Sequence, residues 1–126
     1  MDKKTVNTPG APAPVGPYSQ AIVSGGLVFC SGQIPLDPKT GAMVEGDIAV
    51  EAARVMENLK AVLEAAGSSL DKVVKTTIFL TDLGDFARVN EVYGAFFQTA
   101  PPARSTIQVG ALPKGARVEI ECIAAL

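Results

Sequence analysis

Two stretches of the chain repeat apolar residues at the spacing of an amphipathic helix. Residues 48–66 place small and branched apolar side chains on one face and charged ones on the other. Residues 86–98 repeat this arrangement with several aromatic side chains. Asp47 and Asp85 each stand where an N-cap is expected, and Pro101 prevents the second helix from continuing. The pattern therefore predicts two helices.

Strand-like segments lie on both sides of these helices. The segment AIVSGGLVFCSGQ carries Gly25 and Gly26 between two apolar runs, which indicates a β-hairpin. The segment KVVKTTIFLT is rich in β-branched residues and predicts another strand. Near the C-terminus, PPARSTIQVGALPKGARVEIECIAAL contains two strand-like runs joined by a turn. Residues 7–17, rich in proline and glycine, predict an extended arm or loop.

The predicted order of elements is ββαβαββ. Each helix links two strands, which favours parallel crossovers, and antiparallel hairpins flank them. This combination predicts an α+β fold in which a mixed β-sheet has two helices packed on one face. From the length of the chain, we expect a single domain over residues 1–126.

Two of the predicted strands are apolar at consecutive positions, namely in the runs LVFC and TIFL. Such runs are typical of strands that are buried on both faces. Two helices can cover only one face of the sheet, and no further segment remains to cover the other. We infer a homo-oligomer in which the sheets of neighbouring copies pack together; the alternative is a partly exposed apolar patch.

The composition of the chain argues against nucleic acids and membranes as its partners. The net charge is -2, the pI is about 5.0 and no lysine or arginine cluster is present, so nucleic-acid binding is not expected. No run approaches the roughly 20 apolar residues of a membrane span, and the N-terminus lacks the apolar segment of a signal peptide. We therefore expect a cytoplasmic protein, with Cys30 and Cys122 as free, buried thiols and no metal site.

The chain contains no histidine, which excludes Ser–His and Cys–His nucleophile pairs. Acid–base chemistry must then come from other side chains or from water. Arg104 offers a planar fork that fits a carboxylate, and Glu119 alternates with apolar residues in the last strand, on the same face as Arg117 and Glu121. We expect Arg104 and Glu119 on the sheet face that the helices leave free. Charges on a covered face cost several kcal/mol unless they are paired or used, which strengthens the case for a site and leaves a solvated face as the open alternative.

Four other positions are candidates for the same site. Tyr18 follows a rigid Gly–Pro pair and is either a ligand-binding hydroxyl or an aromatic plug, with the plug favoured from this stretch alone. Ser31 and Gly32 interrupt an apolar strand, which indicates a β-bulge or a close approach of the backbone to a ligand, with the bulge favoured. Asn90 interrupts the apolar stripe of the second helix, either as a structural amide or as a site residue.

Several segments together closely resemble the Rid (YjgF) family, and within it the reactive-intermediate imine/enamine deaminases. These segments are GPYSQA, SGQIPLDPKTG, VVKTTIFLTDLGDF, VNEVYGAFF, PPARSTIQV and LPKGARVEIE, and the resemblance covers about residues 10–124. It implies a chorismate-mutase-like fold assembled as a homotrimer, with sites between subunits. The implied activity is hydrolysis of 2-imino acids, or their enamine tautomers, from pyridoxal-phosphate-dependent dehydratases to 2-keto acids and ammonia, with no cofactor.

The resemblance also implies individual roles. Arg104 would bind the substrate carboxylate, Glu119 would position the hydrolytic water, and the backbone carbonyl of Thr106 would contact the same water. The residues that would line the cleft are Tyr18, Ser31, Gly32 and Asn90. Many relatives have cysteine where this chain has Thr106, but a backbone carbonyl survives that change. A non-catalytic trimer that binds small carboxylates or 2-keto acids remains the alternative. A nuclease or translation inhibitor, which the family also suggests, is disfavoured by the lack of a basic stripe and of a metal-ligand cluster.

Overall fold

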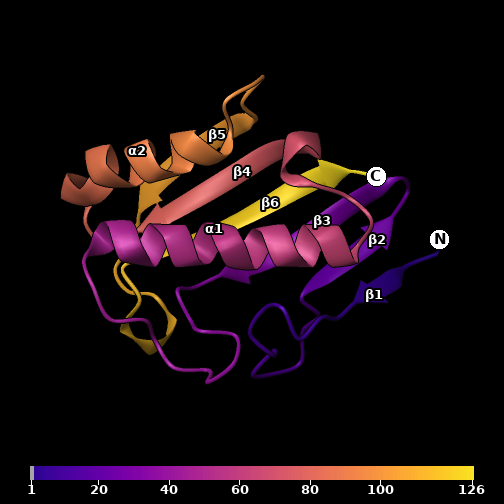
Figure 1. Cartoon of the computed structure of the whole chain (residues 1–126), viewed down its shortest axis with the longest axis horizontal. Coiled ribbons are helices and arrows are strands. Elements are labelled where there is room, and N and C mark those ends of the chain that lie inside the picture. The colour runs from indigo at the N-terminus through magenta and orange to yellow at the C-terminus, as the bar shows by residue number, and fades with distance from the viewer. Residues whose placement is uncertain (1) are drawn as a thin grey trace.

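The computed structural model describes residues 2–126, which form a six-stranded sheet and two α-helices (Figure 1). The elements in chain order are β1 (Lys4–Val6), β2 (Ala21–Ser24), β3 (Leu27–Gln33), α1 (Ile48–Ala65), β4 (Val73–Leu80), α2 (Phe86–Phe96), β5 (Ala103–Gln108) and β6 (Val118–Ala125). Both helices lie on the same face of the sheet. This mixed sheet with two helices on one face confirms the predicted α+β class.

The strand order across the sheet is β1-β2-β3-β6-β4-β5. Only β4 and β5 run parallel, and every other neighbouring pair is antiparallel. The connections through α1 and α2 move the chain in the same direction across the sheet. Because such crossovers are right-handed, they place both helices on one face.

The prediction that the last two strands form a hairpin is wrong, because β4 lies between β5 and β6. The crossover through α2 has already placed β5 beside β4. Residues 109–117 then pass the end of β4, where Val109 N–H donates to Leu80 C=O and Thr81 N–H donates to Arg117 C=O. This loop has to cover about 10 Å, two inter-strand spacings, which its length allows.

The N-terminal strand β1 was not predicted. It pairs antiparallel with β2, with Lys4 opposite Val23, and it buries Val6 in the core. Three residues are too few to show a strand pattern in the sequence, so pairing with an exposed edge defines this strand.

The helix limits agree with the prediction, but the capping does so only in part. The Asp47 carboxylate accepts a hydrogen bond of 3.1 Å from Val50 N–H, as expected for an N-cap. Asp85 makes no such bond. Instead, Asp82 accepts a 2.8 Å bond from Gly84 N–H and caps the short 3-10 turn Leu83–Asp85 that leads into α2.

The core lies between the helices and one face of the sheet. Residues such as Leu59 of α1, Ile78 of β4 and Ile120 of β6 are fully buried there. On the opposite face, Phe29 keeps 42% and Ile107 keeps 45% of its surface exposed. A single chain therefore buries its LVFC and TIFL strands on one side only, and the face that carries Phe29 and Ile107 is called the open face below. No helix within residues 2–126 is long and apolar enough to cross a membrane.

Candidate functional site

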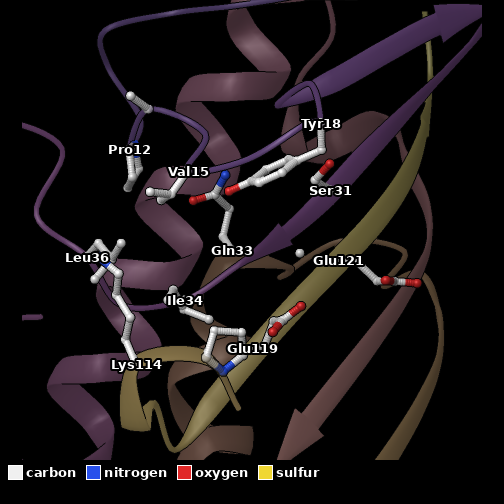
Figure 2. Close-up of a pocket in the computed structure, with 13 residues that line it drawn as sticks. Pro12, Val15, Tyr18, Ser31, Gln33, Ile34, Leu36, Lys114, Glu119 and Glu121 are labelled. Atoms are coloured by element: carbon white, nitrogen blue, oxygen red, sulfur yellow. The ribbon is translucent and has the colours of Figure 1, made fainter. Parts of the chain in front are cut away.

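A hollow of about 690 Å³ opens beside β3 and β6 (Figure 2). It is bounded by the N-terminal arm, β3, the loop before β6 and β6 itself. Its lining residues are Pro12, Ala13, Val15, Tyr18, Ser31, Gly32, Gln33, Ile34, Leu36, Pro113, Lys114, Glu119 and Glu121. Four predicted site residues, Tyr18, Ser31, Gly32 and Glu119, therefore line one hollow.

A β-bulge in β3 shapes the floor of this hollow. Cys30 pairs with Cys122 but Gln33 pairs with Ile120, so β3 uses three steps where β6 uses two. A Cβ atom on Gly32 would lie only 2.0 Å from the Glu119 Oε2 atom. The favoured interpretation of Gly32 as a bulge is confirmed, and the space that its missing side chain leaves holds the Glu119 carboxylate.

The surroundings of Glu119 raise the affinity of its carboxyl for a proton. Partial burial, and secondarily the negative charge of Glu121, raise the pKa of the Glu119 carboxyl above its ordinary value. The neighbouring Ser31 is held in place because its hydroxyl donates a 2.6 Å bond to Ser19 C=O. The Tyr18 ring also borders the hollow and is half exposed, so it is not a buried plug.

Arg104 lies in a second hollow, of about 440 Å³, which Asn90, Tyr93 and Pro102 help to line. Its Nη1 donates a 2.7 Å hydrogen bond to Asn90 Oδ1. Within residues 2–126 its guanidinium forms no ion pair with a carboxylate. Arg104 and Asn90, both predicted site residues, are therefore in direct contact, and the guanidinium charge is not neutralised.

The expectation that Arg104 and Glu119 share one face of the sheet is wrong. Arg104 pairs with Thr76, whose side chain is buried on the helix side, whereas Glu119 pairs with Phe79, which points to the open face. The two residues thus project from opposite faces of the sheet. Their strands are separated by β4, so the alternation within each strand could not fix their relative orientation.

Thr106 lies on the edge strand β5, two residues beyond Arg104. Its buried Oγ1 has no hydrogen-bond partner within the described chain. Backbone groups alternate in direction along a strand, and Val109 N–H bonds to β4 through Leu80 C=O. The Thr106 carbonyl therefore points away from β4, toward the free edge, where it can accept a hydrogen bond.

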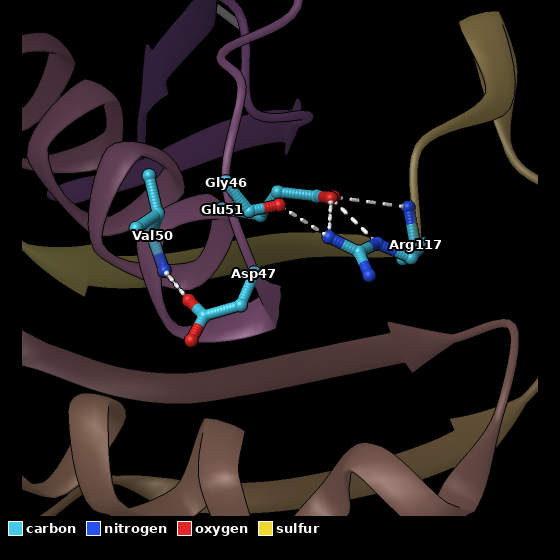
Figure 3. A network of polar contacts seen from close by, with 5 residues as sticks. All are labelled: Gly46, Asp47, Val50, Glu51 and Arg117. Carbon is cyan, nitrogen blue, oxygen red and sulfur yellow. Dashed lines mark hydrogen bonds and ion pairs between the residues drawn. The ribbon is translucent and has the colours of Figure 1, made fainter.

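A charged contact that the sequence did not reveal supports the start of β6 (Figure 3). The buried Glu51 carboxylate of α1 accepts a 2.6 Å bond from Arg117 Nε and pairs with Arg117 Nη2, which also donates to Gly46 C=O at 2.9 Å. The expectation that Arg117 shares a face with Glu119 and Glu121 is wrong, because its side chain turns to α1. The helical pattern placed Glu51 on the charged face and gave no sign of its burial.

Gln20 was also missed, and it holds the N-terminal arm that borders the Glu119 hollow. This side chain is buried. Its amide donates to the carbonyls of Thr8, Ala11 and Pro12, and its oxygen accepts a 2.7 Å bond from Thr8 N–H. The only sign of this role in the sequence was the position of Gln20, between a proline-rich segment and an apolar strand.

Comparison with known proteins places this geometry in a family. The family model described as Endoribonuclease L-PSP matches residues 8–126. Protein DfrA of Myxococcus xanthus is 60% identical over 98% of this chain and 96% of its own length. A 2-iminobutanoate/2-iminopropanoate deaminase of Salmonella typhimurium is 51% identical over 96% of each chain.

The solved structures agree with the sequence comparison. A Rid protein family member from Yersinia pestis superposes with a TM-score of 0.97 at 50% identity, covering 99% of this chain and 100% of its own. The family model, the related sequences and the solved structure each match nearly the whole chain. The chain therefore belongs to the Rid family.

Proposed function

We propose that this protein is a 2-iminobutanoate/2-iminopropanoate deaminase, a hydrolase acting on C=N bonds. The observation that carries the proposal is a pair of matched groups. Arg104 presents an unneutralised guanidinium, and Glu119 presents a carboxyl of raised pKa in an open hollow. A 2-imino acid has a carboxylate for the first group, and its hydrolysis needs proton transfer at the second. The Salmonella relative named for this activity supports the choice of substrate.

The reaction needs only acid–base assistance and orientation of the substrate from the protein. Water adds to the carbon of the protonated imine and gives a carbinolamine, while Glu119 accepts one proton from that water. Glu119 returns that proton to the nitrogen, the C–N bond breaks, and the proton of the carbinolamine hydroxyl passes to the departing ammonia, so the products are a 2-keto acid and ammonium. Such acid–base assistance is worth roughly 10²–10⁴-fold. Arg104 contributes orientation by holding the carboxylate, and the Thr106 carbonyl is proposed to hold the water.

We propose further that the working form is a homotrimer with its sites between subunits. Arg104 and Glu119 project from opposite faces of one sheet, so a single chain does not present both residues to one small molecule. Two neighbouring copies can supply one residue each. The apolar residues of the open face, Phe29 and Ile107, give such copies a surface to bury. The expected cytoplasmic location is part of the proposal, since the free thiols of Cys30 and Cys122 suit a reducing compartment.

The activity is tested with imine made in the assay. An amino-acid oxidase generates 2-iminopropanoate or 2-iminobutanoate in the presence of semicarbazide, which competes with hydrolysis by trapping the imine. Wild-type protein should divert imine from the semicarbazone to free keto acid. Arg104→Ala should lose nearly all of this effect, and Glu119→Gln should lower turnover more than carboxylate binding. A wild-type protein that does not accelerate hydrolysis would leave a carboxylate-binding module as the function.

The shared site is tested by mixing two inactive variants. In a trimer made from equal amounts of Arg104→Ala and Glu119→Gln chains, roughly a quarter of the interfaces receive both intact residues by random assembly. Co-refolded chains should therefore recover about a quarter of wild-type activity. Each variant refolded alone is the control. No recovery in verified mixed trimers would show that one chain carries the whole site.

The description of the family model names an endoribonuclease, but the charge of this chain disfavours RNA as its substrate. A net charge of -2 does not supply the positive surface with which proteins bind the RNA backbone. Hydrolysis of an imine, in contrast, needs only the Arg104 guanidinium and the Glu119 carboxyl.

A further inference from the structure

Arg104 is held by the faces of two aromatic rings rather than by an acid. Its Cζ atom lies 5.0 Å from the centroid of the Tyr93 ring and 5.4 Å from that of Phe86. Phe86, Asn90 and Tyr93 follow one another at intervals of four and three residues along α2, so they form one stripe of the helix. All three residues of this stripe contact the guanidinium. The two rings make cation–π contacts, and Asn90, which lies between them in the sequence, accepts a hydrogen bond from Nη1.

The Tyr93 ring is itself fixed in position. Its hydroxyl lies 2.7 Å from Thr76 Oγ1, and both side chains are buried. Thr76 is the residue of β4 directly beside Arg104 in the strand register. The ring also packs against Phe97, with centroids 4.8 Å apart. The strand next to Arg104 therefore sets the position of the ring that holds it.

Aromatic rings leave free the N–H donors of Arg104 that a carboxylate partner would occupy. A carboxylate partner would bond to the edge of the guanidinium and compete with the carboxylate of a substrate. A ring attracts the cation over its face, so the N–H donors in the guanidinium plane stay available. Within the chain as described from residue 2 onward, Asn90 is the one hydrogen-bond partner of this guanidinium. The remaining donors can meet a ligand.

We propose that Phe86 and Tyr93 are positioning residues that orient the Arg104 guanidinium for the carboxylate of an incoming 2-imino acid. This inference rests on the proposed role of Arg104 as the carboxylate ligand. Without the rings, the arginine side chain would sample more rotamers and bind the carboxylate less well. Glu119, on the opposite face of the sheet, would keep its position, so the change should appear in KM rather than in kcat.

The test compares variants that keep or remove the ring. Tyr93→Leu and Phe86→Leu should each raise KM by about 5–20-fold with kcat nearly unchanged, as expected for loss of a partly desolvated cation–π contact. Tyr93→Phe removes only the hydroxyl and should keep most of the wild-type KM. Phe96→Leu is the matched control, because this aromatic residue of α2 packs against the core and, within residues 2–126, forms no cation–π contact with Arg104.

A second background separates orientation of Arg104 from general damage. In Arg104→Gln, Tyr93→Leu should change kcat/KM at low substrate very little, whereas a merely structural role would lower it equally in both backgrounds. Circular dichroism checks folding, and Phe86→Leu serves if Tyr93→Leu does not fold. An unchanged KM in a folded ring variant, alongside a raised KM in Arg104→Gln, overturns the positioning role alone. An unchanged KM in Arg104→Gln overturns the proposed role of Arg104 as the carboxylate ligand, whereas an inactive wild-type protein overturns the proposed deaminase function itself.

Discussion

Replacing Gly32 with alanine should remove activity while leaving the fold intact. The added Cβ would lie 2.0 Å from Glu119 Oε2, whereas ordinary contact begins at 3.4 Å, so the carboxylate must move by about 1.4 Å (3.4 − 2.0). A misplacement of about 1 Å in a catalytic group can cost about 100-fold in rate. We therefore expect kcat to fall about 100-fold in Gly32→Ala.

The stability of this variant should change little, because the atom in the way is the end of a flexible side chain that can swing into the open hollow. Overpacking of this kind should cost under about 1 kcal/mol, part of which is offset by the lower entropy of an unfolded chain with alanine. The melting temperature should fall by no more than about 5 °C. Steady-state kinetics with in situ imine and thermal unfolding at equal protein concentration measure the two effects.

Gly110→Ala is the matched control. A Cβ at this position meets nothing within 4 Å, so both kcat and stability should stay close to wild type. Full activity in Gly32→Ala would refute the idea that Glu119 works from the space above Gly32. An equal loss of activity in both variants would point instead to a general effect of removing glycine.

Three further predictions follow from charges and thiols. Glu121→Gln removes a charge that raises the pKa of Glu119, so the acid limb of kcat/KM should move to lower pH; a move to higher pH would contradict this. Arg117→Ala leaves the Glu51 side chain, 7% exposed, without its partner and should cost about 2–4 kcal/mol in urea unfolding; Glu51→Ala should cost less, because Arg117 is 43% exposed and can be rehydrated. The Cys122 thiol, whose pKa is raised by its hydrogen bond to Cys30 and by burial, should react with a disulfide reagent only after unfolding.

The helices and most strands were predictable because their patterns are local. The limits of α1 follow from the apolar stripe and from Asp47, both of which act within a few residues. The hairpin between β2 and β3 likewise follows from Gly25 and Gly26, which adopt the positive φ values of 60° and 79° that the turn requires. Interactions between neighbours in the sequence were sufficient for these elements.

The relative orientation of the site residues was not predictable, because it depends on pairings between distant strands. Alternation correctly groups Arg104 with Thr106, but the face they occupy is set by the pairing of β5 with β4. The face of Glu119 is set separately, by the antiparallel register of β6 with β4. A shift of either pairing by one residue would move a whole strand's side chains to the other face. For the same reason, the contact between Arg117 and Glu51 spans 66 residues and leaves no local trace.

In the proposed shared site, each half is built from residues of one chain. The Arg104 half is rigid because the aromatic stripe of α2 and Thr76 of β4 surround it. The Glu119 half is shaped by the bulge of β3 and by the Gly32 gap. Each half is thus formed within one chain, and in the proposed trimer the packing of copies would only have to bring two preformed surfaces together. Preorganised halves lose little further conformational entropy on assembly, which is the condition under which a site shared between subunits orients a small substrate well.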